Sequence, residues 1–317
     1  MKEIFINKDD IKTRIYEWRD DYMDIKFKNY SKDEYLKVCE FLIKISKQSE
    51  QHINWNWARW GWMIHHAEFD NSISDKIGMW FDENELIGIA TYDHLLGESI
   101  FLADERYKLL EESMLKYCIE NYMDENGLGI AINDADKQSI ELLKRNSFVT
   151  NENEENVLEI NLETVDLEYV IPENIKISNV KNLDDVFNYN KVLWHGFDHE
   201  GDAPEDEETI AKFRKMLSAP QNNFHLNVVA KDGDKWVAFC ACWYDKSTDY
   251  AYVEPVCTIY EYRRKGIGQA VVLESLKRCK ELGAKKAYVI STDEFYKNLG
   301  FKQHSHYTFY WYKECKN

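Results

Sequence analysis

The sequence predicts an α/β protein of the mixed-sheet (α+β) type, built from two similar halves, each a twisted mixed sheet flanked by helices. Strand and helix patterns alternate from residue 25 to residue 312. The order of these patterns in the first half returns about 150 residues later, which indicates two similarly folded domains. A third observation distinguishes the halves, because only the second has a glycine-containing turn between a predicted strand and a predicted helix.

The second half gives the clearer set of elements. Strands are expected at 175–180, 224–230, 236–244, 250–259, 287–291 and 306–312, and helices at 183–197, 205–217, 267–282 and 293–299. Residues 236–244 are apolar throughout, which is typical of a strand buried on both faces. The residues Asp232, Gly233 and Asp234 before it predict a hairpin turn.

The first half repeats this order. Strands are expected at 25–30, 77–81, 86–92, 98–103, 128–132 and 157–162, and helices at 33–46, 57–69, 109–122 and 135–145. Residues 151–156 are too polar for a core, so a hairpin loop is expected there. The linker is expected at 164–174, around Pro172. The predicted domains are therefore residues 1–165 and 173–317.

Composition excludes several classes of protein. The 317 residues are 44% hydrophobic, enough for two buried cores. The net charge of −17 and a pI near 5.0 argue against a nucleic-acid partner. No apolar run approaches the roughly 18–20 residues that cross a bilayer, and residues 1–7 lack the apolar region of a signal peptide. A cytoplasmic protein without a membrane partner is expected.

The cysteines and histidines do not indicate a metal site. The 7 cysteines are scattered without a Cys-x-x-Cys pair, so reduced thiols are expected. His195, Asp198 and His199 are metal-ligand types within residues 194–202, but no second cluster accompanies them. This acidic loop is expected either to be solvated or to help recognise a cationic acceptor.

The turn at residues 262–270 carries the strongest functional signal. Arg263, Arg264 and Lys265 precede Gly266, and Gly268 follows where a helix from residue 267 begins. Glycine permits close backbone approach, and the first amides of a helix lack intrahelical partners. The helix macrodipole favours an anion there, so the turn predicts a diphosphate site. Its spacing fits neither a nucleoside-triphosphatase loop nor a dinucleotide fingerprint.

This Arg-x-x-Gly-x-Gly turn, the strand 252–258 before it and the segment 295–301 after it together resemble the GCN5-related N-acetyltransferase (GNAT) family. The resemblance is strong across residues 175–317 and weak before them. It implies acyl transfer from acetyl-CoA, with the diphosphate held by the turn and the pantetheine arm lying beside the strand. The residues then expected to bind the cofactor are Val256, Cys257, Thr258, Arg263, Arg264, Lys265, Gly266, Ile267, Gly268, Gln269 and Ala270.

The strand and the later helix also provide catalytic candidates. By the resemblance, Tyr296 stands where many members carry a tyrosine that protonates the coenzyme A sulfur, and a phenol stays protonated at neutral pH. The alternative is a tyrosine that only packs. Glu254 is the candidate general base, acting through water, and the alternative is a surface carboxylate or an ion pair. Pro255 removes one ladder donor, which predicts a bulge or a strand that separates from its neighbour.

Three features limit what the resemblance implies. The family's Asn-x-x-Ala segment is replaced by residues 290–294, where Ser291 or Thr292 is expected to cap the following helix. Cys257 has no partnering base in the sequence, so it is expected to be structural. The side chains of Arg263 and Arg264 either support the diphosphate or face solvent.

The first half lacks the features of a cofactor site. Its counterpart of the turn, residues 104–108, has no glycine, and Asp104 and Glu105 would repel a diphosphate. The first domain is therefore expected to be a degenerate copy, an arrangement that resembles mycothiol synthase-like acetyltransferases.

The expected activity is N-acetylation of a primary amine on a small molecule, by direct attack within a ternary complex. The sequence does not separate an antibiotic, a polyamine, an amino acid or a peptide amine as the acceptor, and a cationic amine is one candidate. Acetyl-CoA is the only cosubstrate expected, without a metal. The rival hypothesis is a non-catalytic acyl-CoA-binding regulator whose first domain contacts another protein.

Overall fold

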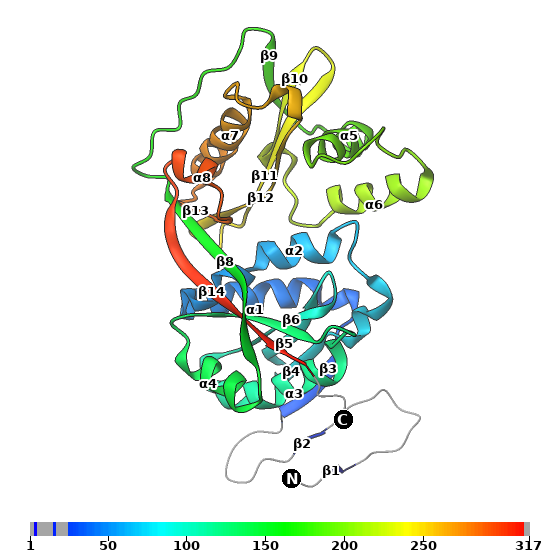
Figure 1. Ribbon diagram of the computed structural model, residues 1–317, viewed down its shortest axis with the longest axis vertical. Coiled ribbons are helices and arrows are strands. Elements are labelled where there is room, and N and C mark those ends of the chain that lie inside the picture. Colours follow the sequence, from blue (N-terminus) through cyan, green and yellow to red (C-terminus); the bar gives the residue numbers. More distant parts are fainter. Residues whose placement is uncertain (1–2, 5–14, 17–24, 314–317) are drawn as a thin grey trace. The chain divides into compact units, whose positions relative to one another are not determined.

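The computed structural model describes residues 3–4, 15–16 and 25–313, and it divides into two compact units (Figure 1). Of these residues, unit 1 takes those up to Trp57, Glu68–Glu155 and those from Ser305 onward. Unit 2 takes Ala58–Ala67 and Asn156–His304. Most of the N-terminal stretch expected to lack a leader, and Cys315, lie outside the described residues.

The elements follow the order that the sequence predicts. The strands are β1 Glu3–Ile4, β2 Ile15–Tyr16, β3 Ile25–Asn29, β4 Gly78–Asp82, β5 Glu85–Asp93, β6 Leu95–Ala103, β7 Leu128–Asn133, β8 Val149–Asn161, β9 Ile175–Asn179, β10 Asn227–Asp232, β11 Lys235–Tyr244, β12 Tyr250–Thr258, β13 Lys286–Ile290 and β14 Lys302–Tyr312. The α-helices are α1 Tyr35–Gln48, α2 Trp57–His65, α3 Glu111–Tyr122, α4 Lys137–Arg145, α5 Val186–Gly196, α6 Glu207–Leu217, α7 Ile267–Leu282 and α8 Glu294–Asn298. Short 3₁₀ helices are η1 Lys32–Glu34, η2 Glu50–Trp55, η3 Asn71–Lys76, η4 Glu105–Leu110, η5 Leu183–Asp185, η6 Phe224–Leu226 and η7 Tyr260–Tyr262.

The sheets of the two units share one strand order. In unit 2, β9, β10, β11 and β12 are antiparallel neighbours, β13 lies parallel to β12, and β8 lies antiparallel to β13. In unit 1, β3, β4, β5 and β6 are antiparallel neighbours, β7 lies parallel to β6, and β14 lies antiparallel to β7. The repeat predicted from the sequence is thus present in the strand pairing.

The last strand of each sheet comes from the other half of the sequence. Residues 307–312 of β14 pair with β7 in unit 1, and residues 157–161 of β8 pair with β13 in unit 2. The compact units therefore do not coincide with the sequence halves at 1–165 and 173–317. The expected linker, residues 164–174, contains no helix or strand and belongs to unit 2.

The hairpin loop expected at residues 151–156 is wrong. These residues belong to β8, which runs unbroken from Val149 to Asn161. Its first part is exposed, while Val157 and Leu158 are buried. Polarity was a poor guide because an exposed strand needs hydrogen-bond partners, not apolar neighbours.

In unit 2, helices cover both faces of the sheet (Figure 1). Cys240 and Cys242 of β11 pack with α7 in one apolar cluster, whereas the intervening Ala241 and nearby Phe239 pack with α5 and α6 in another. Successive strand residues point to opposite faces, so β11 is buried on both sides, as its apolar run predicts. The hairpin predicted at residue 233 joins β10 to β11.

Unit 1 repeats this layering. On β4, Trp80 contacts Tyr117 of α3 with ring centroids 5.6 Å apart, and the next residue, Phe81, lies under Lys37 of α1 at 5.3 Å. Because neighbouring strand residues face opposite sides, α1 and α3 cover opposite faces of this sheet.

His306 ties β14 to unit 1 through two carboxylates. Its Nδ1 lies 2.7 Å from Asp134 and its Nε2 lies 3.0 Å from Glu154. Hydrogen bonds to Glu154 and Asp134 raise the pKa of His306 above its ordinary value, against the effect of burial. Protonated His306 can donate to both carboxylates at once.

We expect this contact to stabilise the protein more at low pH. A raised folded-state pKa gives stability that is fully present below the unfolded pKa of about 6.5 and lost as pH rises through the folded pKa. His306→Gln should therefore lower the urea midpoint more at about pH 5.5 than at about pH 9. The exposed His225→Gln serves as the control. An equal loss for His306→Gln at both pH values would contradict the prediction.

Candidate functional site

In unit 2, β12 separates from β13 partway along its length. The two strands pair only at Tyr250, Ala251 and Tyr252 of β12. Beyond them, the β12–β11 register shifts between Val253 and Val256, which leaves a bulge that contains Pro255. The bulge and the separation predicted from Pro255 are both confirmed.

A cavity of about 630 Å³ lies where the strands part. Its volume falls within the range of small-molecule sites, about 300–1,000 Å³. The residues that line it are Gly196, Phe197, Val256, Cys257, Thr258, Arg263, Arg264, Gly266, Gly268, Gln269, Asp293, Glu294, Phe295, Tyr296, Asn298 and Leu299. Most of the predicted site residues are thus brought together. Glu254, Lys265, Ile267 and Ala270 are not among the lining residues.

The turn before α7 has the backbone geometry of an anion site. Arg264 and Gly266 have left-handed φ angles of 61° and 77°, and Gly266 precedes the first residue of α7. The amides of residues 267–269 precede the first intrahelical bond of α7, which runs from the Ala270 amide to the Gly266 carbonyl. Such amides at a helix N-terminus suit a diphosphate.

The expected role of Ala270 in this turn is wrong. Its amide donates to the Gly266 carbonyl at 3.0 Å, so it already makes the first bond of the helix and has no donor left. Ile267 is 1% exposed and packs in the core with its side chain, so only its backbone can face a ligand. The predicted turn therefore ends one residue earlier than the sequence suggested.

The three cations of the turn have different surroundings. Arg263 donates to the Thr258 carbonyl, to the Gly196 carbonyl and to Asp198. Lys265 lies 5.3 Å from the centroid of the Tyr262 ring. Arg264 lines the cavity, and its guanidinium is not bonded to another described residue. The expectation that Arg263 supports the diphosphate is thus opposed by contacts that already hold its side chain.

Gly268 lets α7 approach β12 closely. A Cβ atom at this position would lie 2.7 Å from the Thr258 hydroxyl oxygen, closer than such contacts allow. Glycine at 268 therefore keeps the space between strand and helix open on the cavity side.

Tyr296 faces the cavity from α8. Asp293 caps this helix by accepting from the Phe295 amide at 2.8 Å, and the Ser291 hydroxyl accepts from the Asp293 amide at 3.0 Å. The Tyr296 ring packs against Phe295 and Phe301. Burial and the charge of Glu254 raise the pKa of the Tyr296 phenol, so the phenol is protonated at neutral pH and able to donate.

Glu254 lies near this phenol without lining the cavity. Its side chain is half-buried in the β12 bulge, and its carbonyl accepts from the Trp243 indole at 2.9 Å. Its charge contributes to the raised pKa of Tyr296. Its role as the general base stays a prediction.

The Cys257 side chain packs against α5. The thiol is buried with α5 residues and donates to the Val192 carbonyl at 3.3 Å. Burial raises its pKa, which disfavours the nucleophilic thiolate. Only its backbone remains suited to a ligand beside β12.

We expect Cys257→Ala to keep turnover within a few-fold of the wild type. The substitution leaves the backbone of β12 intact and removes only a thiol that packs against α5. The melting temperature should therefore fall, while kcat changes little. Mass spectrometry of the wild type after acetyl-CoA treatment should find no acetyl group on Cys257. A trapped acetyl-thioester there, lost in the alanine variant, would contradict the structural role.

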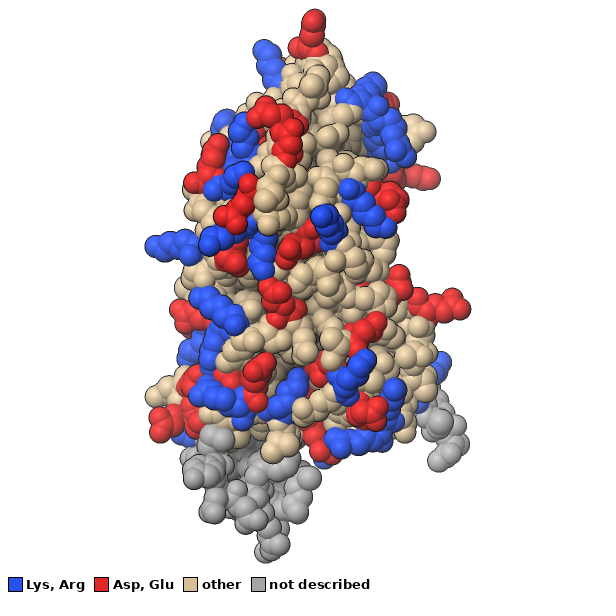
Figure 2. Space-filling model, turned by 90° about the vertical axis from the view of Figure 1, so that its left-hand side faces the viewer, with Lys and Arg blue, Asp and Glu red and all other residues tan. Residues whose placement is uncertain are grey.

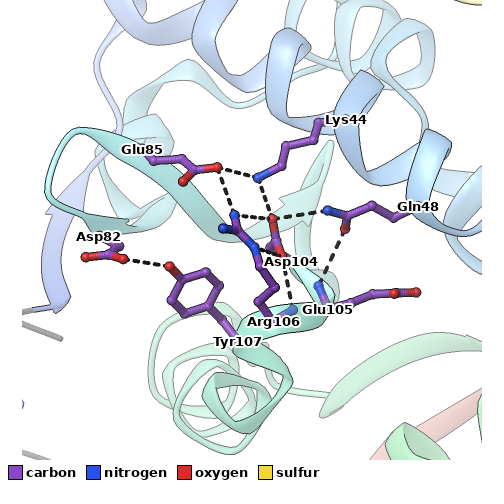
Figure 3. A network of polar contacts seen from close by, with 8 residues as sticks. All are labelled: Lys44, Gln48, Asp82, Glu85, Asp104, Glu105, Arg106 and Tyr107. Carbon is purple, nitrogen blue, oxygen red and sulfur yellow. Dashed lines mark hydrogen bonds and ion pairs between the residues drawn. The ribbon is translucent and has the colours of Figure 1, made fainter. Parts of the chain in front are cut away.

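In unit 1 the corresponding turn is filled by its own side chains (Figure 3). The fully buried Asp104 accepts from the backbone and the guanidinium of Arg106, and also binds Lys44. Burial raises the pKa of Asp104, but the hydrogen bonds from Arg106 and Lys44 outweigh it and hold the pKa below its ordinary value. A carboxylate thus occupies the donors that a phosphate would need.

A second group of ion pairs lies near the start of α3, next to this turn. Lys108 lies 2.9 Å from Glu111 and 3.0 Å from Asp136. It borders a cavity of about 390 Å³ that also contacts His52 and Glu105. With its ammonium between two carboxylates, Lys108 has little attraction left for an anion.

Sequence reasoning missed part of the cavity wall. Phe197, at the end of α5, and Asn298 and Leu299, at the end of α8, line the cavity. The acidic loop after α5 pointed to the first of these regions. The Asn298 amide had no local signal, because its place depends on how α8 packs in the folded unit.

Among residues 3–4, 15–16 and 25–313, no group of three His, Cys, Asp or Glu side chains is arranged to hold a metal ion. None of the helices described there has the length and apolar composition to cross a membrane. The cysteines described there are free thiols: Cys39, Cys118, Cys240, Cys242, Cys257 and Cys279.

Charged side chains of both signs are interspersed over the face drawn in Figure 2. The acidic net charge of −17 is thus accompanied on this face by separated basic groups rather than a continuous basic area. A nucleic-acid footprint would need such a basic area.

Comparison with known proteins agrees with this geometry. The acetyltransferase (GNAT) family matches residues 186–301, which include α5, β12, the turn, α7 and α8. No curated protein matches the sequence.

Two solved structures share the fold over nearly the whole chain. One is a tandem GNAT protein from the clavulanic acid biosynthesis pathway, with a TM-score of 0.62, 10% identity and coverage of 91% of this chain and 98% of that one. The other is a GCN5-related N-acetyltransferase from Sphaerobacter thermophilus, with a TM-score of 0.57, 11% identity and coverage of 91% and 95%. At these identities the likeness concerns the fold, which in this chain is two tandem GNAT-like domains. The match to the acetyltransferase (GNAT) family thus covers residues 186–301, and the two structures extend the likeness of fold to 91% of this chain.

Proposed function

We propose that the protein is an N-acetyltransferase that moves acetyl from acetyl-CoA to a primary amine of a small molecule, by direct attack in a ternary complex. The observation that carries the proposal is the left-handed turn at Arg264 and Gly266 with the first amides of α7, which borders the 630 Å³ cavity at the separation of β12 from β13. Acyl transfer as a reaction class is supported by the family match.

Each requirement of the reaction has a candidate residue. The turn amides would hold the diphosphate, with the Arg264 side chain as the nearby unbonded cation. The exposed backbone of Val256 to Thr258 would pair with the pantetheine arm as an added strand does. The Tyr296 phenol would donate its proton to the departing thiolate. Unit 1, whose turn is filled by Asp104, would not bind the cofactor.

Glu254 is proposed as the base that removes a proton from the amine, through water. Its carboxylate lies near enough to Tyr296 for its charge to raise the phenol pKa. In the wild type kcat/KM should rise with pH on the acidic limb of the profile as the base loses its proton, and Glu254→Gln should make this rise shallower. An unchanged profile would exclude Glu254 and leave free amine as the nucleophile.

The test of the function is an acceptor screen with detection of released thiol, run beside calorimetric titration with acetyl-CoA and coenzyme A. The panel should contain polyamines, aminoglycosides, amino acids and amino sugars. We expect cofactor binding and thiol release with cationic amines. Binding without thiol release across the whole panel would favour a non-catalytic acyl-CoA sensor, and no binding at all would exclude both functions.

A further inference from the structure

Arg263 joins three segments of unit 2 that meet at the cavity. Its Nε donates to the Thr258 carbonyl at 2.8 Å, at the end of β12. Its Nη2 donates to the Gly196 carbonyl at 2.9 Å, at the end of α5. The same nitrogen lies 2.8 and 2.9 Å from the two carboxylate oxygens of Asp198. Charge-assisted bonds of this kind are among the stronger hydrogen bonds in proteins.

The loop after α5 is anchored at further points. Trp194 stacks on His199 with ring centroids 4.5 Å apart, and its indole donates to the Gly201 carbonyl at 3.2 Å. Asn190 donates to the Pro204 carbonyl at 2.6 Å. Residues 197–204 therefore have a defined path, and Arg263 holds the end of that path nearest the cavity.

The loop leaves α5 where helix and strand nearly touch. A Cβ atom on Gly196 would lie 2.5 Å from the Cys257 sulfur, so only glycine permits this approach. Phe197 follows with a side chain that is 49% exposed and lines the cavity. Asp198, next in sequence, has a left-handed φ of 61°. Its ion pair with Arg263 thus fixes the residue beside the Phe197 wall.

We propose that Arg263 is a positioning residue that holds residues 197–204 against the cavity, and that it does not bind the diphosphate of the cofactor. Its guanidinium would have to leave Asp198 and two carbonyls to reach an anion. The loop it holds supplies Phe197, so its loss should weaken binding of the amine rather than of coenzyme A. This inference rests on the proposed function for its kinetic consequence but not for the loop contact itself.

The neighbouring Arg264 supplies a matched control. Both arginines line the same cavity and belong to the same turn, but the Arg264 side chain is not bonded to another described residue. Asparagine tolerates left-handed φ angles, so Arg264→Asn removes the cation while keeping the turn. For the same reason Asp198→Asn removes the charge of residue 198 without straining its backbone.

The experiment compares Arg263→Gln, Asp198→Asn, their double variant and Arg264→Asn. Hydrogen–deuterium exchange of residues 197–204 is measured without ligand, coenzyme A affinity by calorimetry, and KM for the amine found in the screen by thiol release. We expect Arg263→Gln and Asp198→Asn to lose protection in the loop and to raise the amine KM about fivefold, with coenzyme A affinity within about twofold of wild type. The double variant should be no worse than either single one. Arg264→Asn should weaken the affinity for coenzyme A and leave the exchange protection of the loop and the KM for the amine unchanged.

Two results would overturn the proposal. One is an affinity for coenzyme A that falls in Arg263→Gln as much as in Arg264→Asn, while Asp198→Asn keeps the wild-type affinity. Arg263 would then contact the diphosphate. The other is unchanged exchange of residues 197–204 in both single variants. If the wild type bound no coenzyme A, the proposed function would fail, while the exchange result would still decide whether Arg263 holds the loop. Arg263→Lys, which keeps the charge, covers the case in which the glutamine variant does not fold.

Discussion

Gly266→Val is expected to raise the dissociation constant for acetyl-CoA roughly tenfold or more, a loss of about 1.4 kcal/mol in binding. Gly266 has a φ of 77°, and a β-branched residue is a strong outlier in that region. The valine variant would have to change the backbone of the turn, which would displace the first amides of α7. A Cβ at 266 would also lie 3.3 Å from the Val170 carbonyl of the linker. Isothermal titration with acetyl-CoA measures the effect.

Gly233→Val is the matched control for this variant. Gly233 lies in the same unit and has a φ of 59°, and a Cβ atom added to it would meet no heavy atom within 4 Å beyond its own chain neighbours among the described residues. Both valine variants should lower the melting temperature through backbone strain, but only Gly266→Val should weaken binding of acetyl-CoA. Equal affinities in the two variants would remove the turn from the site.

Tyr296→Phe is expected to lower kcat by about 10²-fold or more, the usual range for loss of a general acid, with little change in KM for acetyl-CoA. Phenylalanine keeps the ring packed against Phe295 and Phe301, so only the proton donor is lost. Interactions made only in the transition state affect kcat and kcat/KM equally. Steady-state and single-turnover measurements of thiol release test this.

The control is Tyr260→Phe, in which an exposed tyrosine next to the same turn loses its hydroxyl. Tyr260 is 73% exposed and lies outside the cavity lining, so kcat should stay at the wild-type value. A Tyr296→Phe enzyme with full turnover would show that the phenol only packs. Thiolate release would then need another donor or solvent.

Local signals predicted most of the candidate site. The apolar run of β11, the hairpin at Gly233 and the glycine turn before α7 are each decided by residues within a few positions of one another. The same holds for the strand separation at Pro255, because a missing amide hydrogen disrupts the ladder wherever it falls. These features could be predicted from the sequence because their physical cause is short-range.

Contacts between residues far apart in the chain could not be predicted from the sequence. Arg263 seemed available for a phosphate because Asp198, which binds it, lies 65 residues earlier. Residues 151–156 seemed a loop because nothing nearby shows which segments pair in the folded protein. The lining by Asn298 likewise depends on the packing of α8.

The pairing of β14 with β7 has a consequence for biosynthesis. Tyr307 lies opposite Asn133, so the ribosome must translate some 170 further codons before the sheet of unit 1 receives its final strand. Until then β7 presents an open edge to other nascent chains. The sheet of unit 1 therefore stays incomplete until the end of the second half has been synthesised.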